Sequence, residues 1–585
     1  MSEIKLSDYI ARRLREHYGV KCVFMITGGG AMHLNDSMGR HIPYICNHHE
    51  QASSFGAEGF AKTSRELAVV SVTTGPGGLN CLNGVFGQWT DSVPVLYISG
   101  QVKRQTALVS YPETPLRQLG DQEVDIINTV KPLTKYAALV LEPYDIKYHL
   151  DKAIHEALSG RQGPVWLDVP IDVQSTMIEE DSLKEFTPPK APVYDLKIDE
   201  VAEKLNAAKR PLIVLGHGIR LSGTESEISK FKVPTVTTLN GFDLMEDENP
   251  NYIGRIGTIG QRAGNFALQN ADVVLCLGTR NNIRQVSYQF ENFAKNAFKI
   301  VVDIDPAELQ KPTVKPDLAV CADLKNFLPK MPPITATKEW LEFCSRLKLK
   351  YAPDKENRQD GDKINPYCFL NTLTDSFLPN TTCILANGSA TVCTFQVAKV
   401  KQGLRYILNS GNASMGFALP AAIGVACAGA KNVVCIEGDG SIMMNLQELQ
   451  TVVHHAFSIK IFVLNNQGYS SIKQTQANFF NGHLTGADPK SGVSMPDFCE
   501  VARAFGLKTV KISNVGEISA KIKEVLKAQE PVLCEVLIDP DSTFAPKLSA
   551  KRLEDGTLVS PSLEDMFPFL PREEFEECMP FSVVR

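Results

Sequence analysis

Two apolar runs in the last third of the chain each end on a short polar side chain beside glycine. The run "NVVCIE" leads into a Gly-Asp-Gly turn centred on Asp439, and the run "KIFVLN" is followed directly by Asn466. The segment 441–464 between them has the length of a helical crossover, so the two runs read as neighbouring parallel strands. Because ligands bind outside the carboxyl ends of such strands, we expect Asp439 and Asn466 to lie side by side at a binding edge.

These groups suit a metal-bridged diphosphate. The carboxylate of Asp439, the amide oxygen of Asn466 and a backbone carbonyl from the turn at Gly468 form the hard oxygen set that Mg²⁺ prefers. Backbone N–H groups at the start of the following helix can face a phosphate. Either turn alone would be an ordinary Asp-Gly or Asn-Gly turn, but their occurrence on consecutive strands favours a site. The phosphate-facing positions are Gly438, Gly440 and Ser441.

The elements that must position these residues fall into three α/β blocks. We expect them at 1–180, 195–335 and 360–540, joined by polar, proline-bearing linkers. In each block, short apolar runs ending in glycine turns alternate with helical stretches, which predicts doubly wound domains with mainly parallel sheets. The tail, 541–585, is expected to pack as an arm or a lid. A chain of 585 residues is too long for one core, which agrees with several domains.

Composition is that of an ordinary soluble globular enzyme, with 43% hydrophobic and 22% charged residues. A net charge of −6 without a long basic run argues against nucleic acid as the main partner. Residues 1–20 read as a charged amphipathic helix rather than a signal peptide, and the longest apolar stretch, 416–430, is too short to span a membrane. The 14 cysteines form no C-x-x-C pair, so we expect buried free thiols and a cytoplasmic protein.

Gly-Asp-Gly followed, one crossover later, by Asn-Asn resembles the signature of thiamine-diphosphate (ThDP) enzymes. The three blocks resemble the acetolactate synthase branch of that family along nearly the whole chain. This resemblance implies that the first block binds the pyrimidine of ThDP, that the second is a central domain, and that the third binds the diphosphate. It also implies a homodimer or homotetramer with the site at the subunit interface.

The resemblance requires a glutamate from the first block, and "NHHEQASSFGAEG" supplies Glu50. A carboxylate bonded to the pyrimidine N1′ favours the imino tautomer, whose nitrogen removes the thiazolium C2 proton. For His48 and His49, supporting and surface roles both stay open. Further matching positions in this block are Thr74 and Gly75 of "TTGPGG", and Gly30 and Ala31 of "ITGGGAMH", which would lie near the reacting carbon. Gln101 matches an active-site glutamine of the family. Lys135 matches a lysine at the substrate entrance, and a simply exposed lysine is the alternative.

Third-block positions carry over in the same way. Met415 in "GNASMGFALP" matches the family residue that wedges between the two cofactor rings, and the backbone carbonyl of Ala413 would meet the 4′-amino group. An ordinary core methionine is the alternative for Met415. Other cofactor-contacting positions implied by the resemblance are Gly388, Ser389, Ala390 and Tyr469.

Acetolactate synthases keep an FAD in the central domain that takes no part in the net reaction. Four segments here, "VLGHGIRLSG", "GRIGTIGQRAGN", "CLGTRNNIR" and "VVDIDP", follow the order of the family's FAD-contacting segments. Two arginines beside a glycine-ended strand could hold a pyrophosphate. The family's Asp-Asp after the first arginine is Asn281-Asn282 here, and related decarboxylases carry other nucleotides or none, but we favour FAD. The matching positions are Gly216, His217, Gly218, Thr258, Ile259, Gly278, Arg280, Arg284 and Asp303.

A second departure concerns the substrate. Gln474-Thr475-Gln476 stands where acetolactate synthases carry a tryptophan flanked by glutamines, and a threonine leaves room for a larger or more polar acceptor. We expect decarboxylation of a 2-oxo acid such as pyruvate and transfer of the C2 carbanion to a carbonyl acceptor, with a nucleotide-linked keto-sugar as one candidate. Acetolactate synthesis proper and simple decarboxylation remain alternatives. An inactive paralogue acting as a binding subunit is a third, which intact Glu50, Asp439 and Asn466 argue against.

Overall fold

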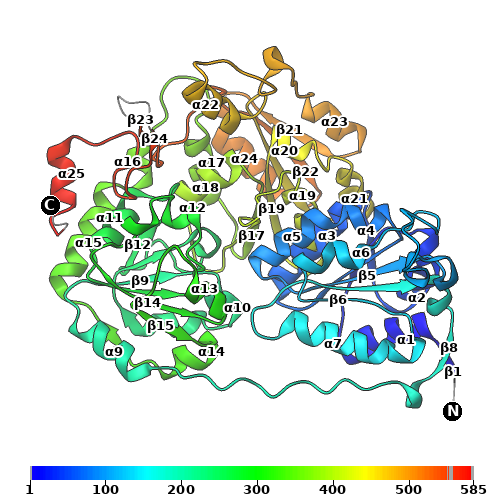
Figure 1. Ribbon diagram of the computed structural model, residues 1–585. Coiled ribbons are helices and arrows are strands. Elements are labelled where there is room, and N and C mark those ends of the chain that lie inside the picture. Colours follow the sequence, from blue (N-terminus) through cyan, green and yellow to red (C-terminus); the bar gives the residue numbers. More distant parts are fainter. Residues whose placement is uncertain (1–2, 550, 553–557, 582–585) are drawn as a thin grey trace.

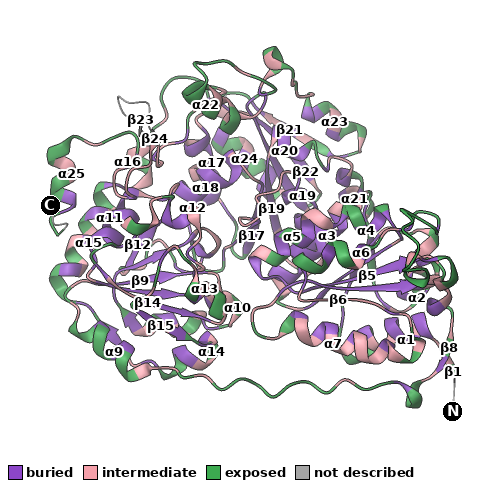
Figure 2. Cartoon of the chain, viewed as in Figure 1, coloured by how far each residue is buried: buried purple, intermediate pink, exposed green. Residues whose placement is uncertain are grey.

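The computed structural model describes residues 3–549, 551–552 and 558–581, and three six-stranded parallel sheets organise them (Figure 1). The expected α/β fold with three mainly parallel sheets is confirmed. The inner strands of each sheet are buried nearly along their length (Figure 2), as expected where helices cover both faces.

The N-terminal sheet has the strand order β3-β2-β4-β5-β7-β6. Its strands are β2 (Val23–Met25), β3 (Tyr44–Cys46), β4 (Ala68–Val72), β5 (Val95–Gln101), β6 (Tyr136–Leu139) and β7 (Val165–Pro170). The helices that matter for the site are α3 (Glu50–Ser64), α4 (Pro76–Asn80), α5 (Leu82–Asp91) and α7 (Ile146–Leu158).

The central sheet has the order β12-β11-β9-β13-β14-β15. Its strands are β9 (Pro211–Leu215), β11 (Thr235–Thr237), β12 (Tyr252–Arg255), β13 (Val273–Leu277), β14 (Phe298–Asp303) and β15 (Leu318–Cys321). Helices α10 (Gly218–Leu221), α11 (Arg262–Asn270) and α12 (Ile283–Val286) follow β9, β12 and β13.

The C-terminal sheet has the order β18-β17-β19-β20-β22-β21. Its strands are β17 (Thr381–Leu385), β18 (Arg405–Leu408), β19 (Asn432–Gly438), β20 (Ile459–Asn465), β21 (Lys508–Ile512) and β22 (Val532–Leu537). Its site-bearing helices are α18 (Ser389–Val397), α19 (Ala418–Cys427), α20 (Asp439–Ile442), α21 (Glu448–His454) and α22 (Ser470–Phe479).

The N-terminal and C-terminal sheets share one hydrophobic core, the other face of the N-terminal sheet has a separate core, and the central sheet has its own. Helices α3 and α19 join the first two by backbone-to-backbone packing. A Cβ on Gly59 would lie 2.1 Å from the carbonyl oxygen of Ala421, and one on Gly424 would lie 1.8 Å from that of Gly56. Only glycine permits this approach, so the two domains are fixed relative to each other.

The described part of the tail lies along α11 of the central domain, where Figure 1 shows α25 (Arg572–Cys578). Asn265 Nδ2 donates to the carbonyl of Leu563 at 3.0 Å, and Asn270 Nδ2 donates to that of Cys578 at 2.8 Å. These amide contacts attach the tail to the central domain as an arm.

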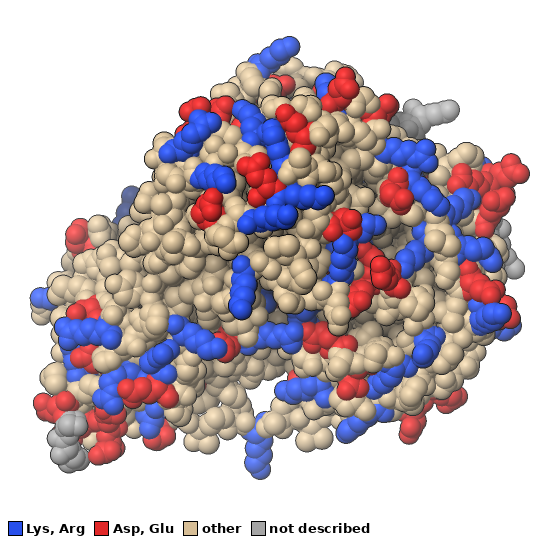
Figure 3. Space-filling model, turned by 180° about the vertical axis from the view of Figure 1, so that it is seen from behind, with Lys and Arg blue, Asp and Glu red and all other residues tan. Residues whose placement is uncertain are grey.

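The molecular surface carries both signs of charge. On the face seen in Figure 3, Lys and Arg side chains alternate with Asp and Glu. In the described part of the chain, every helix is too short or too polar to cross a lipid bilayer.

Candidate functional site

Four predicted positions of the first block meet at the carboxyl edge of its sheet. Gly30 follows β2, and its N–H donates to Thr73 Oγ1 at 3.1 Å. Thr74 follows β4, and its hydroxyl donates to the carbonyl of Gly100 on β5 at 3.0 Å. A Cβ on Gly30 would lie 1.9 Å from Thr74 Oγ1, so this turn must stay side-chain free. Ala31 and Gly75 lie in the same pair of turns.

Glu50 begins α3 directly after β3, at the same edge. Its carboxylate accepts a hydrogen bond of 2.9 Å from Asn80 at the end of α4, its one side-chain partner among the described residues. His49 caps the helix, because its Nδ1 accepts from the N–H of Gln51 at 3.1 Å. His48 contributes its backbone, whose N–H donates to Glu448 Oε1 at 2.8 Å. The Glu50 carboxylate therefore remains available to a ligand.

Gln101 ends β5 with its amide turned into the protein. Nε2 donates to Asp168 Oδ2 at 2.9 Å and to the carbonyl of Val124 at 3.1 Å, while Oε1 accepts from the N–H of Val102 at 2.9 Å. Burial raises the pKa of Asp168 to about 7 although Ser99 and Gln101 donate to its carboxylate. These hydrogen bonds hold the amide of Gln101 between β7, the loop at Val124 and the end of its own strand.

Lys135 does not lie at the binding edge. It precedes β6, at the amino end of the sheet, and its ammonium donates to the carbonyls of Glu156 and Ser159. It thus satisfies free carbonyls at the end of α7, a common role for lysine. A role for Lys135 at a substrate entrance stays a prediction; in the described chain its ammonium is engaged by backbone carbonyls.

The positions predicted to bind a metal lie together where β19 and β20 end. Asp439 Oδ2 accepts from the N–H groups of Asn466 and Gly468, both at 3.0 Å, and Oδ1 accepts from Gly440 N–H at 2.7 Å. Burial raises the pKa of Asp439 to about 6, although these N–H groups act in the opposite direction. The side-chain oxygen of Asn466 is buried without a hydrogen-bond partner in the described structure. A buried acceptor normally has a partner, so this oxygen fits a Mg²⁺ ligand.

Two helix starts border these predicted positions. Gly388 follows β17 with φ of 71°, and space around it is open, since no atom lies within 4 Å of a Cβ built there. Ser389 and Ala390 begin α18 behind it and are buried. Because β17, β19 and β20 are adjacent, the turn at Gly388 and the turn at Gly438 face the same region. Their N–H groups can receive a diphosphate.

Tyr469 closes the other side of the Gly-Asp-Gly turn. A Cβ on Gly440 would lie 2.1 Å from Tyr469 Cε1, so the ring packs flush against the glycine. Ser441 Oγ accepts from the N–H of Gly416 at 2.9 Å, which ties the turn to the loop 409–416. Ser441, a predicted diphosphate position, is therefore bonded to the residue that follows Met415.

The loop 409–416 holds Ala413 in the left-handed region, with φ of 55°. The N–H of Ala413 bonds to both oxygens of Asn409, at 2.9 Å and 3.1 Å, and Asn83 of α5 donates to Ser414 Oγ at 2.8 Å. A non-glycine residue in this conformation costs of order 1–3 kcal/mol, so surrounding contacts must hold it. Met415 lies half-buried at the end of this loop.

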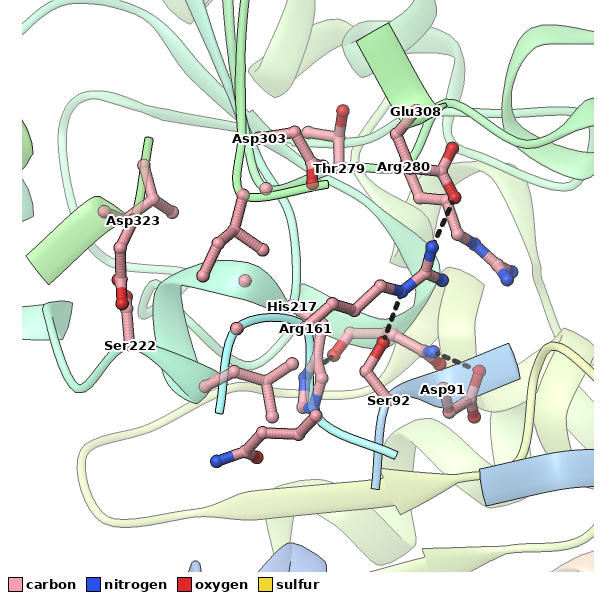
Figure 4. Close-up of a pocket in the computed structure, with 18 of the residues that line it drawn as sticks. Asp91, Ser92, Arg161, His217, Ser222, Thr279, Arg280, Asp303, Glu308 and Asp323 are labelled. Carbon is pink, nitrogen blue, oxygen red and sulfur yellow. Dashed lines mark hydrogen bonds and ion pairs between the residues drawn. The ribbon is translucent and has the colours of Figure 1, made fainter. Parts of the chain in front are cut away.

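A cavity of about 610 Å³ lies between the central domain, the N-terminal domain and the linker 189–192 (Figure 4). Most of the expected FAD positions line it, namely His217, Gly218, Ile259, Gly278, Arg280, Arg284 and Asp303. The remaining two support the lining. A Cβ on Gly216 would lie 2.1 Å from the carbonyl of Gly278, and Thr258 Oγ1 donates to the carbonyl of Arg284 at 2.8 Å.

The cavity contains an uncompensated cation. Arg284 has no side-chain hydrogen bond or ion pair with any described residue, and burial lowers its pKa. Arg280 donates to the backbone carbonyl of Thr90 at 2.8 Å, which leaves its charge without a paired carboxylate. Asn281 uses its oxygen within the loop, accepting from Thr279 at 2.8 Å and Gln285 at 3.0 Å. The arrangement favours an anionic group of a ligand beside the two arginines.

Several cavity residues were absent from the sequence-based set. Arg161 bonds to Asp305 and Glu308, both at 2.9 Å, and to Ser92 at 3.0 Å; Figure 4 draws the bonds to Glu308 and Ser92. Asp323 lies just beyond β15, and its position after a strand could have identified it as a cavity residue from the sequence. The cavity residues from the N-terminal domain could not be recognised in the sequence, because only the packing of the domains brings them next to the central sheet. Others in this group are Asp91, Asn240 and Ser410.

The segment that departs from the tryptophan pattern forms α22, which has no buried residue. Thr475 is exposed, and its hydroxyl donates to the carbonyl of Ser471 in the same helix at 2.9 Å. Gln474 and Gln476 contact Phe544 and Thr485 instead. The side chain of Thr475 therefore borders open space.

Comparison with known proteins covers all three domains. Models described as "Thiamine pyrophosphate enzyme" match in order: the N-terminal TPP binding domain at 4–127, the central domain at 198–331 and the C-terminal TPP binding domain at 386–536. The chain is 31% identical over 541 residues to acetolactate synthase isozyme 1 large subunit of Escherichia coli, covering 91% of this chain and 93% of that one. It is 32% identical over 553 residues to a probable acetolactate synthase large subunit of Methanocaldococcus jannaschii, covering 90% of each. The large subunit from Lactococcus lactis is 31% identical over 574 residues, covering 94% and 96%.

Proposed function

Because this chain belongs to the acetolactate synthase-like family of ThDP-dependent enzymes, we propose which residues run its reaction, which assembly it needs and which acceptor it uses. The reaction is ThDP-dependent decarboxylation of a 2-oxo acid, pyruvate in the proposed case, with transfer of the C2 carbanion to a carbonyl acceptor. Bound ThDP supplies the carbanion chemistry, and the protein supplies binding, orientation and proton transfer.

Asp439, Asn466 and the carbonyl of Gly468 are proposed to hold Mg²⁺. The observation that carries this assignment is the buried, unpartnered Asn466 Oδ1 beside the Asp439 carboxylate. N–H groups at Gly388, Ser389 and Ala390 and at the Gly-Asp-Gly turn would receive the diphosphate oxygens. Ala413 and Met415, held by the strained loop, would meet the pyrimidine and the space between the rings.

Glu50 is proposed to bond to the pyrimidine N1′ and to exchange a proton there. Its carboxylate has Asn80 as its only side-chain partner in the described structure and lies at the same sheet edge as Gly30 and Ala31. Those two residues would border the reacting carbon, where the turn leaves no side chain in the way. Gln101 is proposed to act by orienting this edge, because its amide is fully engaged.

The active form is proposed to be a homodimer, or a homotetramer built from such dimers, with Glu50 and Asp439 of one site on different subunits. An uncovered apolar face flanks Asn80, the partner of Glu50. On α4 and α5, the side chains of Leu79, Phe86 and Trp89 remain between 38% and 39% exposed. A two-fold dimer would bury this face on both chains and produce two equivalent sites.

The central cavity is proposed to hold FAD as a bound, non-reacting group. Its volume, its location at the carboxyl edge of a parallel sheet and the uncompensated Arg284 support a dinucleotide with a pyrophosphate. Saturation with FAD followed by removal of free flavin tests this. Retention of the visible flavin absorption band supports the assignment, and a colourless protein would contradict it.

A nucleotide-linked keto-sugar is the proposed acceptor, since Thr475 leaves open space where an indole would stand. A second candidate is pyruvate itself, because the compared relatives are named acetolactate synthases. Product analysis with ¹³C-labelled pyruvate separates them, first alone and then with a panel of nucleotide-linked keto-sugars and simple 2-oxo acids. Labelled carbon in a branched sugar supports the first candidate. Acetolactate as the sole product under all conditions would contradict it.

A further inference from the structure

Asp91, the last residue of α5, stands in the wall between the central cavity and the loop 409–416. Its carboxylate accepts from two successive N–H groups of that loop, Ser410 to Oδ2 and Gly411 to Oδ1, both at 3.2 Å. Asp91 and Ser410 both line the cavity. One side chain therefore touches the cavity and holds the segment that leads to the pyrimidine positions.

The same carboxylate is bonded to the central domain. Asn240 Nδ2 donates to Asp91 Oδ1 at 3.1 Å, and the ring of His217 donates from Nδ1 to the carbonyl of Asn240 at 3.1 Å. His217 and Asn240 also line the cavity, and Figure 4 shows His217 and Asp91 on its wall. A continuous chain of hydrogen bonds thus runs from His217 through Asn240 and Asp91 to Gly411.

Lys62 holds Asp91 in place from the side of the core. Its ammonium bonds to Asp91 Oδ2 at 3.1 Å, to Glu58 Oε1 at 2.6 Å and to the carbonyl of Leu408 at 2.7 Å. Glu58 in turn accepts from Asn409 Nδ2 at 3.2 Å. Burial alone would raise the pKa of Asp91, but the nearby Lys62 and Arg280 outweigh it and lower the pKa, so Asp91 is an ionised acceptor.

The loop 409–416 is packed so closely against Asp91 that a shift of this side chain would also move the loop. A Cβ on Gly411 would lie 2.3 Å from Thr90 Oγ1 and 2.9 Å from Asp91 Oδ1. Two residues later, Ala413 holds its left-handed conformation through Asn409, the residue that also bonds to Glu58. The contacts that fix the pyrimidine-facing backbone are therefore the contacts that surround Asp91.

We propose that Asp91 is a positioning residue that couples a dinucleotide in the central cavity to ThDP binding at the loop 409–416. This inference rests on the proposed FAD and ThDP sites. A bound dinucleotide excludes water from the cavity wall, so that Asn240, Ser410 and Gly411 keep Asp91 as their acceptor. Without the dinucleotide, water competes for these polar groups, and the loop samples conformations that bind ThDP less well.

The test measures the dissociation constant of ThDP by calorimetry, in saturating Mg²⁺, for FAD-free and FAD-saturated protein. FAD should tighten ThDP binding by roughly 5-fold to 150-fold, the usual range for coupled sites, and ThDP should tighten FAD binding by the same factor. In Asp91→Asn, which keeps the side-chain shape, and in Asn240→Ala, which cuts only the link to the central domain, this factor should fall to near one.

Gln261→Ala is the matched control. Gln261 Nε2 also makes an interdomain hydrogen bond, to the carbonyl of Gln396 at 2.6 Å, but it does not contact the chain that runs through Asp91. This variant should retain the wild-type coupling factor.

The possible outcomes distinguish a failure of the proposed FAD site from a failure of the proposed coupling. A protein that fails to bind FAD overturns the cavity assignment and the coupling with it. FAD binding that leaves the ThDP dissociation constant unchanged overturns the coupling alone. Wild-type coupling in both Asp91→Asn and Asn240→Ala shows that Asp91 is not the link.

Discussion

The carboxylate of Asp439 is fixed from the neighbouring strand end, where its Oδ2 accepts a hydrogen bond of 3.0 Å from the backbone N–H of Gly468. This bond crosses from the end of β19 to the turn after β20, so one side chain aligns the two segments that carry the proposed metal ligands. The N–H groups set the orientation of the carboxylate, and the orphaned oxygen of Asn466 lies on the adjoining turn.

Asp439→Ala should abolish ThDP retention in the presence of Mg²⁺ while the protein stays folded. The substitution removes a metal ligand and leaves the N–H groups of Asn466 and Gly468 without an acceptor, a local cost of about 1–3 kcal/mol. Calorimetric titration with ThDP and Mg²⁺ measures the effect, and circular dichroism checks the fold. Asp541→Ala, at an exposed position, is the control. Wild-type ThDP affinity in Asp439→Ala would refute the metal assignment.

Glu50→Gln should keep ThDP bound but slow turnover by roughly 10²-fold to 10⁴-fold, because an amide cannot exchange the proton at N1′. Steady-state rates and ThDP affinity should be measured on the same preparation. Glu66→Gln, in the exposed pair with Lys21, should behave like wild type. Near-normal turnover of Glu50→Gln would remove this residue from the mechanism.

Arg284→Met should weaken FAD binding by about 10-fold to 100-fold, since a hydrogen bond to a charged group contributes about 1.5–3 kcal/mol. FAD-free Arg284→Met should be no less stable than FAD-free wild type, because the change removes a desolvated cation that has no partner among the described residues.

Arg262→Met provides the contrast, since Arg262 pairs with Glu356 at 2.7 Å and also bonds to the carbonyls of Met566 and Pro568. Its loss should destabilise the protein. Thermal unfolding of both variants without FAD decides the point, and strong destabilisation by Arg284→Met would show that its charge is compensated.

His217 should make the stability of the FAD-free protein fall as the pH falls below 6.5. Burial, together with the positive charges of Arg405 and Lys62, lowers the pKa of His217 from 6.5 to about 3. The folded form therefore stays neutral in a range where the unfolded form takes up a proton, and stability is lost as pH drops from 6.5 toward 3. The contribution between pH 6.5 and about 5.5 is roughly 1 kcal/mol.

Urea unfolding at several pH values, compared between wild type and His217→Gln, measures this contribution, with exposed His483→Gln as the control. The His217→Gln curve should lose stability less steeply below pH 6.5. Parallel curves for wild type and His217→Gln would contradict the neutral state of this ring in the folded protein.

Sequence was sufficient to place residues that directly follow a strand. Asp439, Asn466, Gly30 and Thr74 each follow a buried parallel strand, and a parallel sheet gathers such residues at one edge whatever the rest of the fold does. The alternation of apolar runs and helices likewise specifies the three sheets, because both patterns are local.

The direction of side chains and the packing of domains could not be predicted from the sequence. Gln101 is at the expected strand end, but its partner Asp168 comes from β7, and only the strand order shows that β7 lies next to β5. Asp91 ends an ordinary helix and becomes a cavity residue only because α5 packs against the central domain. Lys135 precedes β6, and only the fold shows that the end of α7 supplies the carbonyls it contacts.

The most direct test of the central claim, that Glu50 and Asp439 serve one ThDP from different subunits, is to mix two inactive chains. A dimer of Glu50→Gln with Asp439→Ala would contain one site with both residues intact and one with neither. Differently tagged chains, purified as verified mixed dimers and assayed for CO₂ release from pyruvate, should recover up to about half the wild-type activity per dimer, as two equivalent sites require. Mixed dimers that stay wholly inactive would show that each site is built within one chain.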